Sequence, residues 1–177
     1  MIRRAIFLFL CICAAFLAVA RGHVWLIRAT TEKFERRHVM PDQRGSRESG
    51  GIPIRNDRFG EGHFGAKRRG GRKHLGIDIK AAIATPVMAS KSGFARPYCV
   101  PHGYGNLVII IHPSGDETRY GHLDTVGIKG FGWVMRGEII GTVGKTGNAD
   151  TPGLDAHLHY EIRRGGTPID PEPEIAD

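Results

Sequence analysis

Cysteine is scarce in this sequence of 177 residues, and its positions exclude two classes of protein. Cys11 and Cys13 lie in an apolar stretch at the N-terminus, so Cys99 would be alone in a chain that has lost this stretch. A disulfide scaffold and a cysteine-based zinc site are therefore both excluded. The sequence also lacks an internal repeat and a nucleic-acid-binding motif, so we expect neither a repeat architecture nor a nucleic-acid partner.

Long apolar runs are also rare, and the clearest one covers residues 5–20. Two arginines precede this run, and small residues end it at Ala20, which is the pattern of a cleaved export signal. We therefore expect residues 1–20 to be a signal peptide. An uncleaved anchor is the alternative, because apolar residues continue beyond Arg21 and would associate residues 5–27 with the membrane. Either way, the remaining chain is expected in the periplasm or cell envelope.

The net charge of +7 is distributed unevenly along the chain. Residues 21–73 hold fourteen Lys and Arg against six Asp and Glu, whereas residues 74–177 hold nine against twelve. We expect residues 21–58 to be a basic linker. Three roles stay open for it: a solvated spacer, a segment that holds an anionic polymer or the membrane surface, and a pro-region that covers a site.

Short apolar or β-branched segments alternate with glycine turns from about residue 59 onward. Clear examples are residues 75–79, 107–111, 139–143 and 158–162. Several short strands at fairly regular spacing predict one antiparallel, mainly β domain over residues 59–172, followed by a short acidic tail at 173–177. We expect this domain to be a monomer.

Two pairs of polar residues lie on these expected strands. His157 and His159 are two residues apart, so a strand directs both side chains to the same face. His74 and Asp78 also share a face if their segment is extended, and Gly76 between them leaves space for a third group to approach. Each pair alone is weak evidence for a site.

Together, the two pairs supply a familiar set of metal ligands. His74, Asp78 and one histidine of the second pair would give zinc two imidazoles and one carboxylate, with the fourth position open to water. The remaining histidine would lie beside that water as a base. His122 is a further candidate for the same face.

The same residues belong to a longer series of motifs that resembles the lysostaphin/LytM-type zinc metallopeptidases. The order and spacing of these motifs agree with that family from about Phe59 to Pro171. The matching stretches are His74-Leu75-Gly76-Ile77-Asp78-Ile79, Thr85-Pro86-Val87, Gly103-Tyr104-Gly105-Asn106, Tyr120-Gly121-His122-Leu123, Gly137-Glu138-Ile139-Ile140-Gly141, Gly144-Lys145-Thr146-Gly147, His157-Leu158-His159-Tyr160-Glu161-Ile162-Arg163 and Pro168-Ile169-Asp170-Pro171.

The resemblance implies a fold, an activity and a set of roles. The fold is an antiparallel β-sheet groove of the duplicated hybrid motif type, with little helix. The activity is zinc-dependent hydrolysis of peptide bonds in bacterial peptidoglycan. His74, Asp78 and His159 are implied as ligands of Zn²⁺, and His122 and His157 as catalytic residues. Some members have lost ligands and only activate other hydrolases, so a non-catalytic wall-binding or activating domain is the alternative.

Two departures from the family pattern concern substrate preference. The segment 148–156 is longer than the usual approach to the histidine pair, and Ala156 replaces a common proline. We expect this segment to border the site. His112 is expected to be structural or solvated, and Tyr104 to shape a turn or the core. Glu161 shares the face of the two histidines and is expected to be a surface residue, with a contact behind a ligand as the alternative.

Overall fold

The structure is a computed structural model that describes residues 32–33, 39–40 and 52–175. The expected signal peptide at 1–20 and the alternative anchor at 5–27 lie outside these residues, as does most of the basic segment 21–58. Within the described ranges, none of the helices has the length and apolar character that a membrane crossing requires.

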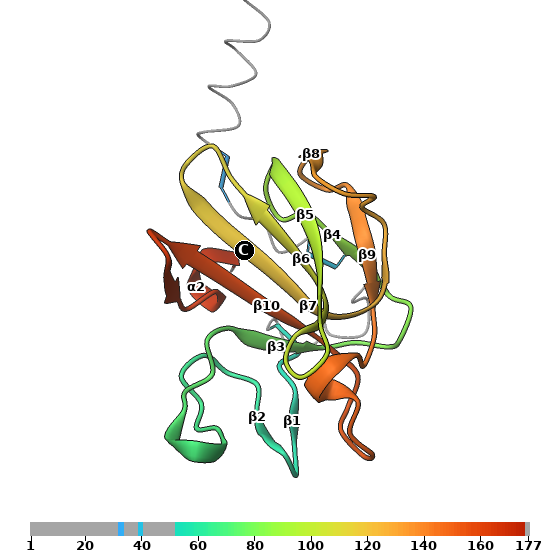
Figure 1. Cartoon of the computed structure of the whole chain (residues 1–177). Helices are drawn as coiled ribbons and strands as arrows, with labels where there is room; N and C mark the ends of the chain where they lie inside the picture. The colour runs from blue at the N-terminus through green and yellow to red at the C-terminus, as the bar shows by residue number, and fades with distance from the viewer. Residues whose placement is uncertain (1–31, 34–38, 41–51, 176–177) are drawn as a thin grey trace, which may run out of the picture.

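Antiparallel strands dominate the described chain, which confirms the predicted fold class (Figure 1). A small hairpin, β1 and β2, precedes a sheet of nine strands, and a single-turn helix, α2, follows it. The elements are β1 Asn56–Asp57, β2 Gly60–Glu61, β3 Ile77–Lys80, β4 Pro86–Met88, β5 Gly93–Val100, β6 Gly105–Ile111, β7 Asp116–Val126, β8 Gly132–Val134, β9 Ile139–Val143, β10 His157–Arg164, β11 Thr167–Ile169 and α2 Glu172–Ile175, with 3-10 turns at Arg69–Gly71 and Gly147–Ala149.

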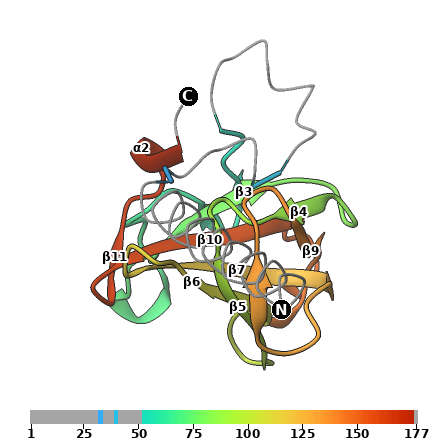
Figure 2. The same ribbon diagram turned by 90° about the horizontal axis from the view of Figure 1, so that it is seen from above.

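Strand β10 occupies the position in the sheet that brings distant segments together (Figures 1 and 2). One of its edges pairs with β7, and the other pairs first with β3 and then with β11. Strands β6, β5 and β8 continue the sheet beyond β7, while β9 joins β7 to β4. The register places His159 opposite both Asp78 on β3 and Gly121 on β7. Residues 78, 121 and 159 therefore meet on neighbouring strands.

The core forms on one face of β10, as the alternation of its side chains predicts. Leu158, Tyr160 and Ile162 are fully buried, and Ile77 and Ile79 of β3 pack in the same cluster. The opposite face of β10 is also covered, because His157, His159 and Glu161 are buried too. A loop between β2 and β3 lies against this second face (Figure 1).

Parts of the basic N-terminal segment belong to the packed unit. Val39 and Met40 are buried in the core, and the Met88 amide donates a hydrogen bond of 3.0 Å to the Val39 carbonyl. Ile54 forms a bridge with Ile79 of β3. The packed unit thus includes residues on the N-terminal side of residue 59, where the sequence patterning becomes regular.

Candidate metal centre

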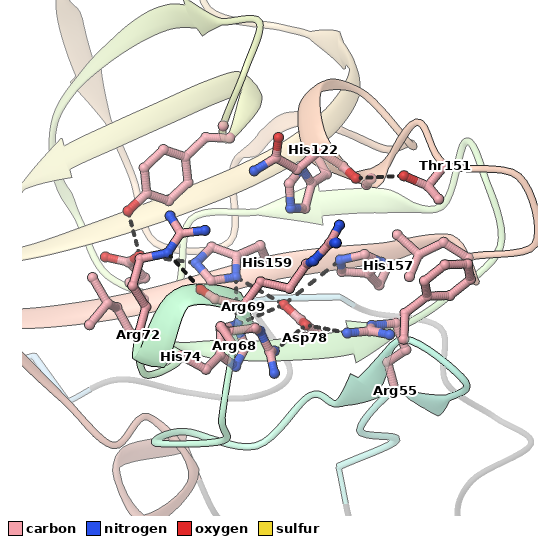
Figure 3. A pocket seen from close by; sticks show the side chains of 18 of the residues that line it. Arg55, Arg68, Arg69, Arg72, His74, Asp78, His122, Thr151, His157 and His159 are labelled. Atoms are coloured by element: carbon pink, nitrogen blue, oxygen red, sulfur yellow. Dashed lines mark hydrogen bonds and ion pairs between the residues drawn. The ribbon is translucent and has the colours of Figure 1, made fainter.

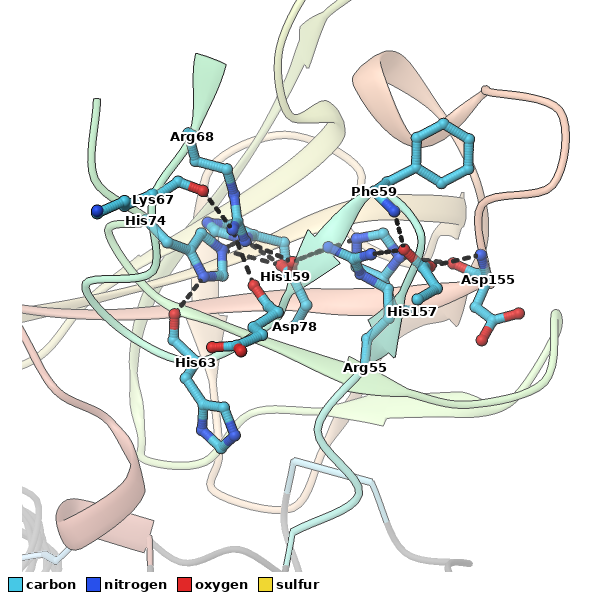
Figure 4. Close-up of polar contacts among 12 residues, drawn as sticks. Arg55, Phe59, His63, Lys67, Arg68, His74, Asp78, Asp155, His157 and His159 are labelled. Carbon is cyan, nitrogen blue, oxygen red and sulfur yellow. Dashed lines mark hydrogen bonds and ion pairs between the residues drawn. The ribbon is translucent and has the colours of Figure 1, made fainter. Parts of the chain in front are cut away.

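His74, Asp78 and His159 converge on one buried point (Figure 4). The His74 Nε2 and His159 Nδ1 atoms are 3.0 Å apart. The Asp78 Oδ1 atom lies 3.0 Å from His74 Nε2 and 2.9 Å from His159 Nδ1. Two imidazole nitrogens and one carboxylate oxygen therefore face one another, although their residues are up to 85 positions apart in the chain.

His74 reaches this point from a loop and not from a strand. Strand β3 begins only at Ile77, so the extended segment that the sequence predicted is shorter than expected. The backbone of His74 is held by hydrogen bonds with Gly65 and Ala66, and its Nδ1 lies 2.9 Å from the His63 carbonyl. Since that carbonyl can only accept a hydrogen bond, Nδ1 carries the proton and Nε2 keeps its lone pair for a metal.

Gly76 allows the loop and the strand to meet. A Cβ atom at this position would lie 2.2 Å from the Tyr160 carbonyl oxygen and 2.8 Å from the Cγ atom of Glu161. The space that the sequence predicted beside Gly76 is therefore filled by the backbone and a side chain of β10.

Glu161 was predicted to be a surface residue, with a contact behind the ligands as the alternative. The surface prediction is wrong, and the structure supports the alternative. Its side chain is fully buried, and Oε1 lies 3.0 Å from His159 Nε2. It also accepts hydrogen bonds of 2.7 Å from the Tyr104 hydroxyl and 2.8 Å from Arg163 Nε. The position of Glu161 two residues beyond His159 was the available signal, because alternate strand residues share a face.

The contacts of Glu161 determine the charges around His159. Burial alone would raise the pKa of Glu161, but the hydrogen bond and charge of His159 and the Tyr104 and Arg163 hydrogen bonds lower this pKa to about 2. Burial alone would lower the pKa of His159, yet its hydrogen bonds with Asp78 and Glu161 raise it to about 9. Glu161 thus orients the His159 ring with Nδ1 toward the centre.

Two arginines hold the other oxygen of Asp78 (Figure 4). Arg55 Nη2 is 3.0 Å and Arg68 Nη2 is 3.1 Å from Asp78 Oδ2. Burial alone would raise the pKa of Asp78, but its close contacts with the rings of His159 and His74 hold this pKa well below its usual range. The carboxylate is therefore ionised, with Oδ1 left to face the two histidines.

His122 and His157 stand beside the three ligand candidates (Figure 3). Their ring centroids are 5.0 Å apart, and His122 is 5.8 Å from the His159 ring. The Nδ1 atom of each ring lies 2.8 Å from a backbone carbonyl, that of Thr146 for His122 and that of Asp155 for His157. Each neutral ring therefore keeps its proton on Nδ1 and presents an Nε2 lone pair.

The environment keeps both of these rings neutral. Burial, followed by the neighbouring His159 and His157, lowers the pKa of His122 to about 3. Burial is also the largest cause of the lowered pKa of His157. His122 additionally has a left-handed backbone with φ of 60°, which is uncommon for a residue with a side chain and recurs at functional sites.

The donor set fits a small divalent metal. In a tetrahedral zinc site with bonds of ~2.0 Å, the ligand atoms lie ~3.3 Å apart. The three donor atoms are already 2.9 to 3.0 Å from one another, so a small outward movement would admit the ion. The five residues singled out by the sequence all line one pocket, together with Asn148, Thr151 and Leu154 of the segment 148–156, which therefore borders the site as expected.

Comparisons with known proteins identify the family of this chain. The profile described as peptidase family M23 matches residues 72–171. The catalytic domain of lysostaphin from Staphylococcus simulans superposes with a TM-score of 0.55 and 31% identity, over 63% of this chain and 86% of that domain. A structure described as a zinc-containing peptidase from Vibrio cholerae gives a TM-score of 0.56 and 31% identity, over 78% of this chain and 39% of the other. The chain belongs to peptidase family M23.

Curated relatives are larger proteins with more than one described role. The DD-carboxypeptidase/endopeptidase Mpg of Neisseria meningitidis is 45% identical over 100 residues, which are 56% of this chain and 22% of the relative. The murein hydrolase activator NlpD of Salmonella dublin is 36% identical over 110 residues, which are 62% of this chain and 27% of that protein. The chain thus spans about a fifth to a quarter of the length of these relatives.

Proposed function

We propose that this protein is a zinc metalloendopeptidase that hydrolyses peptide bonds of bacterial peptidoglycan. The observation that carries the proposal is the convergence of His74, Asp78 and His159 within one pocket that also contains His122 and His157. The family match and the peptidase names of several relatives support it. The apolar N-terminal run supports a site of action outside the cytoplasm, and we propose that the protein acts there as a monomer.

We propose a role for each of these five side chains. His74 Nε2, Asp78 Oδ1 and His159 Nδ1 would hold the ion. When bound there, zinc supplies a Lewis acid that activates water and polarises a carbonyl. His157 accepts the proton of the attacking water through Nε2, because its Nδ1 proton is engaged by the Asp155 carbonyl. His122 Nε2 is a second proton acceptor in the same pocket. The single proton that water releases, held on one of these two rings, then passes to the leaving amine.

The test combines metal content with product analysis on the full-length protein. We expect about one zinc per chain after reconstitution and release of soluble muropeptides from purified sacculi. The His159→Ala variant should lose both bound zinc and release. Mass spectrometry of the fragments identifies the bond that is cut. Zinc-loaded protein that releases no fragments would contradict the proposal.

A second candidate function is activation of another hydrolase, as the name of the relative NlpD describes for that protein. The two functions differ in what His157→Ala does. We expect this variant to lose about 100- to 10,000-fold in kcat while it keeps its zinc, because a general base contributes that much. His102→Ala, which changes an exposed histidine of the pocket rim, is the control and should stay active. Full biological effect of His157→Ala would favour the activator.

A further inference from the structure

One short hairpin brings a group of positive charges to the rim of the metal pocket. Residues 67–73 carry Lys67, Arg69, Arg72 and Lys73, and all four line the same pocket as His122 and His157. Figure 3 shows Arg69 and Arg72 beside the histidines. All four residues are exposed. This hairpin lies largely before the stretch that matches the family profile.

The cationic side chains of this hairpin form no ion pairs with Asp or Glu side chains in the described part of the chain. Asp78 is paired with Arg55 and Arg68, and Glu161 with Arg163. In contrast, Lys67, Arg69, Arg72 and Lys73 make no ion pair among the described residues, and Arg72 only donates a hydrogen bond from Nε to the Arg69 carbonyl. The pocket rim therefore has a positive charge that nothing in the described structure compensates.

The hairpin has a fixed position relative to the metal ligands. Lys67 and Lys73 form a bridge, and the Arg68 amide donates a hydrogen bond of 2.8 Å to the Arg72 carbonyl. Gly70 and Gly71 make the tight tip with φ of 73° and 74°. The Arg68 side chain then ties the hairpin to the Glu61 carbonyl at 2.8 Å and to Asp78 Oδ2 at 3.1 Å.

We propose that Arg69 and Arg72 form a subsite for a free carboxylate of the peptide substrate, close to the bond that is cut. A guanidinium binds a carboxylate through two parallel hydrogen bonds, so two arginines that have no acidic partner among the described residues, beside a hydrolytic centre, select an anionic peptide. Lys67 and Lys73 add to the attraction at longer range. This inference rests on the proposed function, because it names the group that the same pocket recognises next to the scissile bond.

The test compares soluble peptidoglycan stem peptides that differ only in their carboxylates. One set keeps all carboxylates, a second has the C-terminal carboxylate amidated, and a third has the side-chain carboxylates amidated. For the full-length, zinc-loaded protein, we expect kcat/KM to fall roughly 10- to 100-fold when the recognised carboxylate is amidated, mainly through KM. The set that shows the loss identifies whether the terminal or a side-chain carboxylate binds.

Variants of the arginines separate recognition from folding. The double variant Arg69→Gln and Arg72→Gln should cleave native and amidated peptides with equal kcat/KM. Its zinc content should be unchanged, because neither side chain contacts the three ligand candidates. Arg96→Gln is the matched control, since Arg96 is an exposed arginine on β5 that does not line the pocket. This control should keep the preference of the wild type.

Binding measurements keep the inference separate from the proposed activity. Calorimetric titration of each peptide into the wild type should give roughly 10-fold or greater weakening for the amidated form, whether or not the peptide is cut. The double variant should show no difference. Equal affinity of the wild type for native and fully amidated peptides would overturn the subsite, even with cleavage intact. Carboxylate-dependent binding without any cleavage would overturn the proposed function and keep the subsite.

Discussion

The proton positions on His122 and His157 limit what each ring can do at neutral pH. Both Nδ1 protons are donated to backbone carbonyls, and the pKa of both rings is lowered by burial. At neutral pH, the Nε2 atom of each ring therefore carries a lone pair and can accept a proton but cannot donate one. To donate a hydrogen bond to a developing oxyanion or to protonate a leaving amine, His122 must therefore first take up a proton on Nε2.

Arg55 and Arg68 give a prediction about metal affinity. Because both arginines hold Asp78 Oδ2, Oδ1 is left to face His74 and His159. We expect the double variant Arg55→Met and Arg68→Met to bind zinc roughly 10- to 100-fold more weakly, as for other residues that orient a ligand. Competition with a chromophoric chelator measures the affinity. Arg58→Met is the control, because Arg58 donates to the Pro152 carbonyl instead, and unchanged affinity in the double variant would contradict the role.

His112 gives a prediction about stability and pH. Its ring is buried between the Ser92 carbonyl and the Thr118 hydroxyl, and burial lowers its pKa to about 4. The unfolded chain therefore binds a proton near pH 6.5 that the folded chain does not bind until about pH 4. The stabilisation is complete above pH 6.5, falls by up to about 3 kcal/mol as the pH drops to about 4, and then stays constant.

The measurement for His112 is chemical unfolding across this pH range. The free energy of unfolding of the wild type should fall more steeply between pH 6.5 and 4 than that of His112→Gln, which cannot take up a proton. Parallel curves for the two proteins would show that His112 does not contribute.

At the level of elements, the close approach of β3 to β10 determines how the candidate ligands His74, Asp78 and His159 lie relative to one another. Gly76 faces the Tyr160 carbonyl with no room for a Cβ atom. We expect Gly76→Ala to push the loop that carries His74 away from β10, to cost at least about 2 kcal/mol of stability and to weaken zinc binding. Gly132→Ala on β8 is the control, because a Cβ atom there has open space. Thermal unfolding and zinc titration of both variants test the difference.

Much of the strand pattern could be predicted from alternation alone. Leu158, Tyr160 and Ile162 face the core, and the two histidines between them share the other face. The local spacing of His74 and Asp78 also predicted a shared site, although His74 lies before the strand. The roles of Arg55 and Arg68 were not predictable, since both reach Asp78 from loops whose position depends on long-range packing. The same holds for the Tyr104–Glu161 hydrogen bond.

For the whole molecule, a metal would add a direct link between segments that hydrogen bonds and ion pairs already hold together. Its ligands come from the loop before β3, from β3 and from β10. With free zinc at about 1,000 times Kd, binding adds about 4 kcal/mol of stability, and Tm should rise by roughly 10 °C over chelator-treated protein. Calorimetry should show this shift with zinc but not with calcium. The His159→Ala variant should show little shift, and an equal shift in that variant would point to another binding site.

The burial of Val39 and Met40 determines where a shortened form of this protein can begin. A chain that starts at residue 59 would leave a gap in the hydrophobic core beside Met88 and would remove the guanidinium of Arg55 from Asp78. Recombinant fragments, and any natural processing that leaves an active enzyme, should therefore retain the sequence from at least Val39 onward.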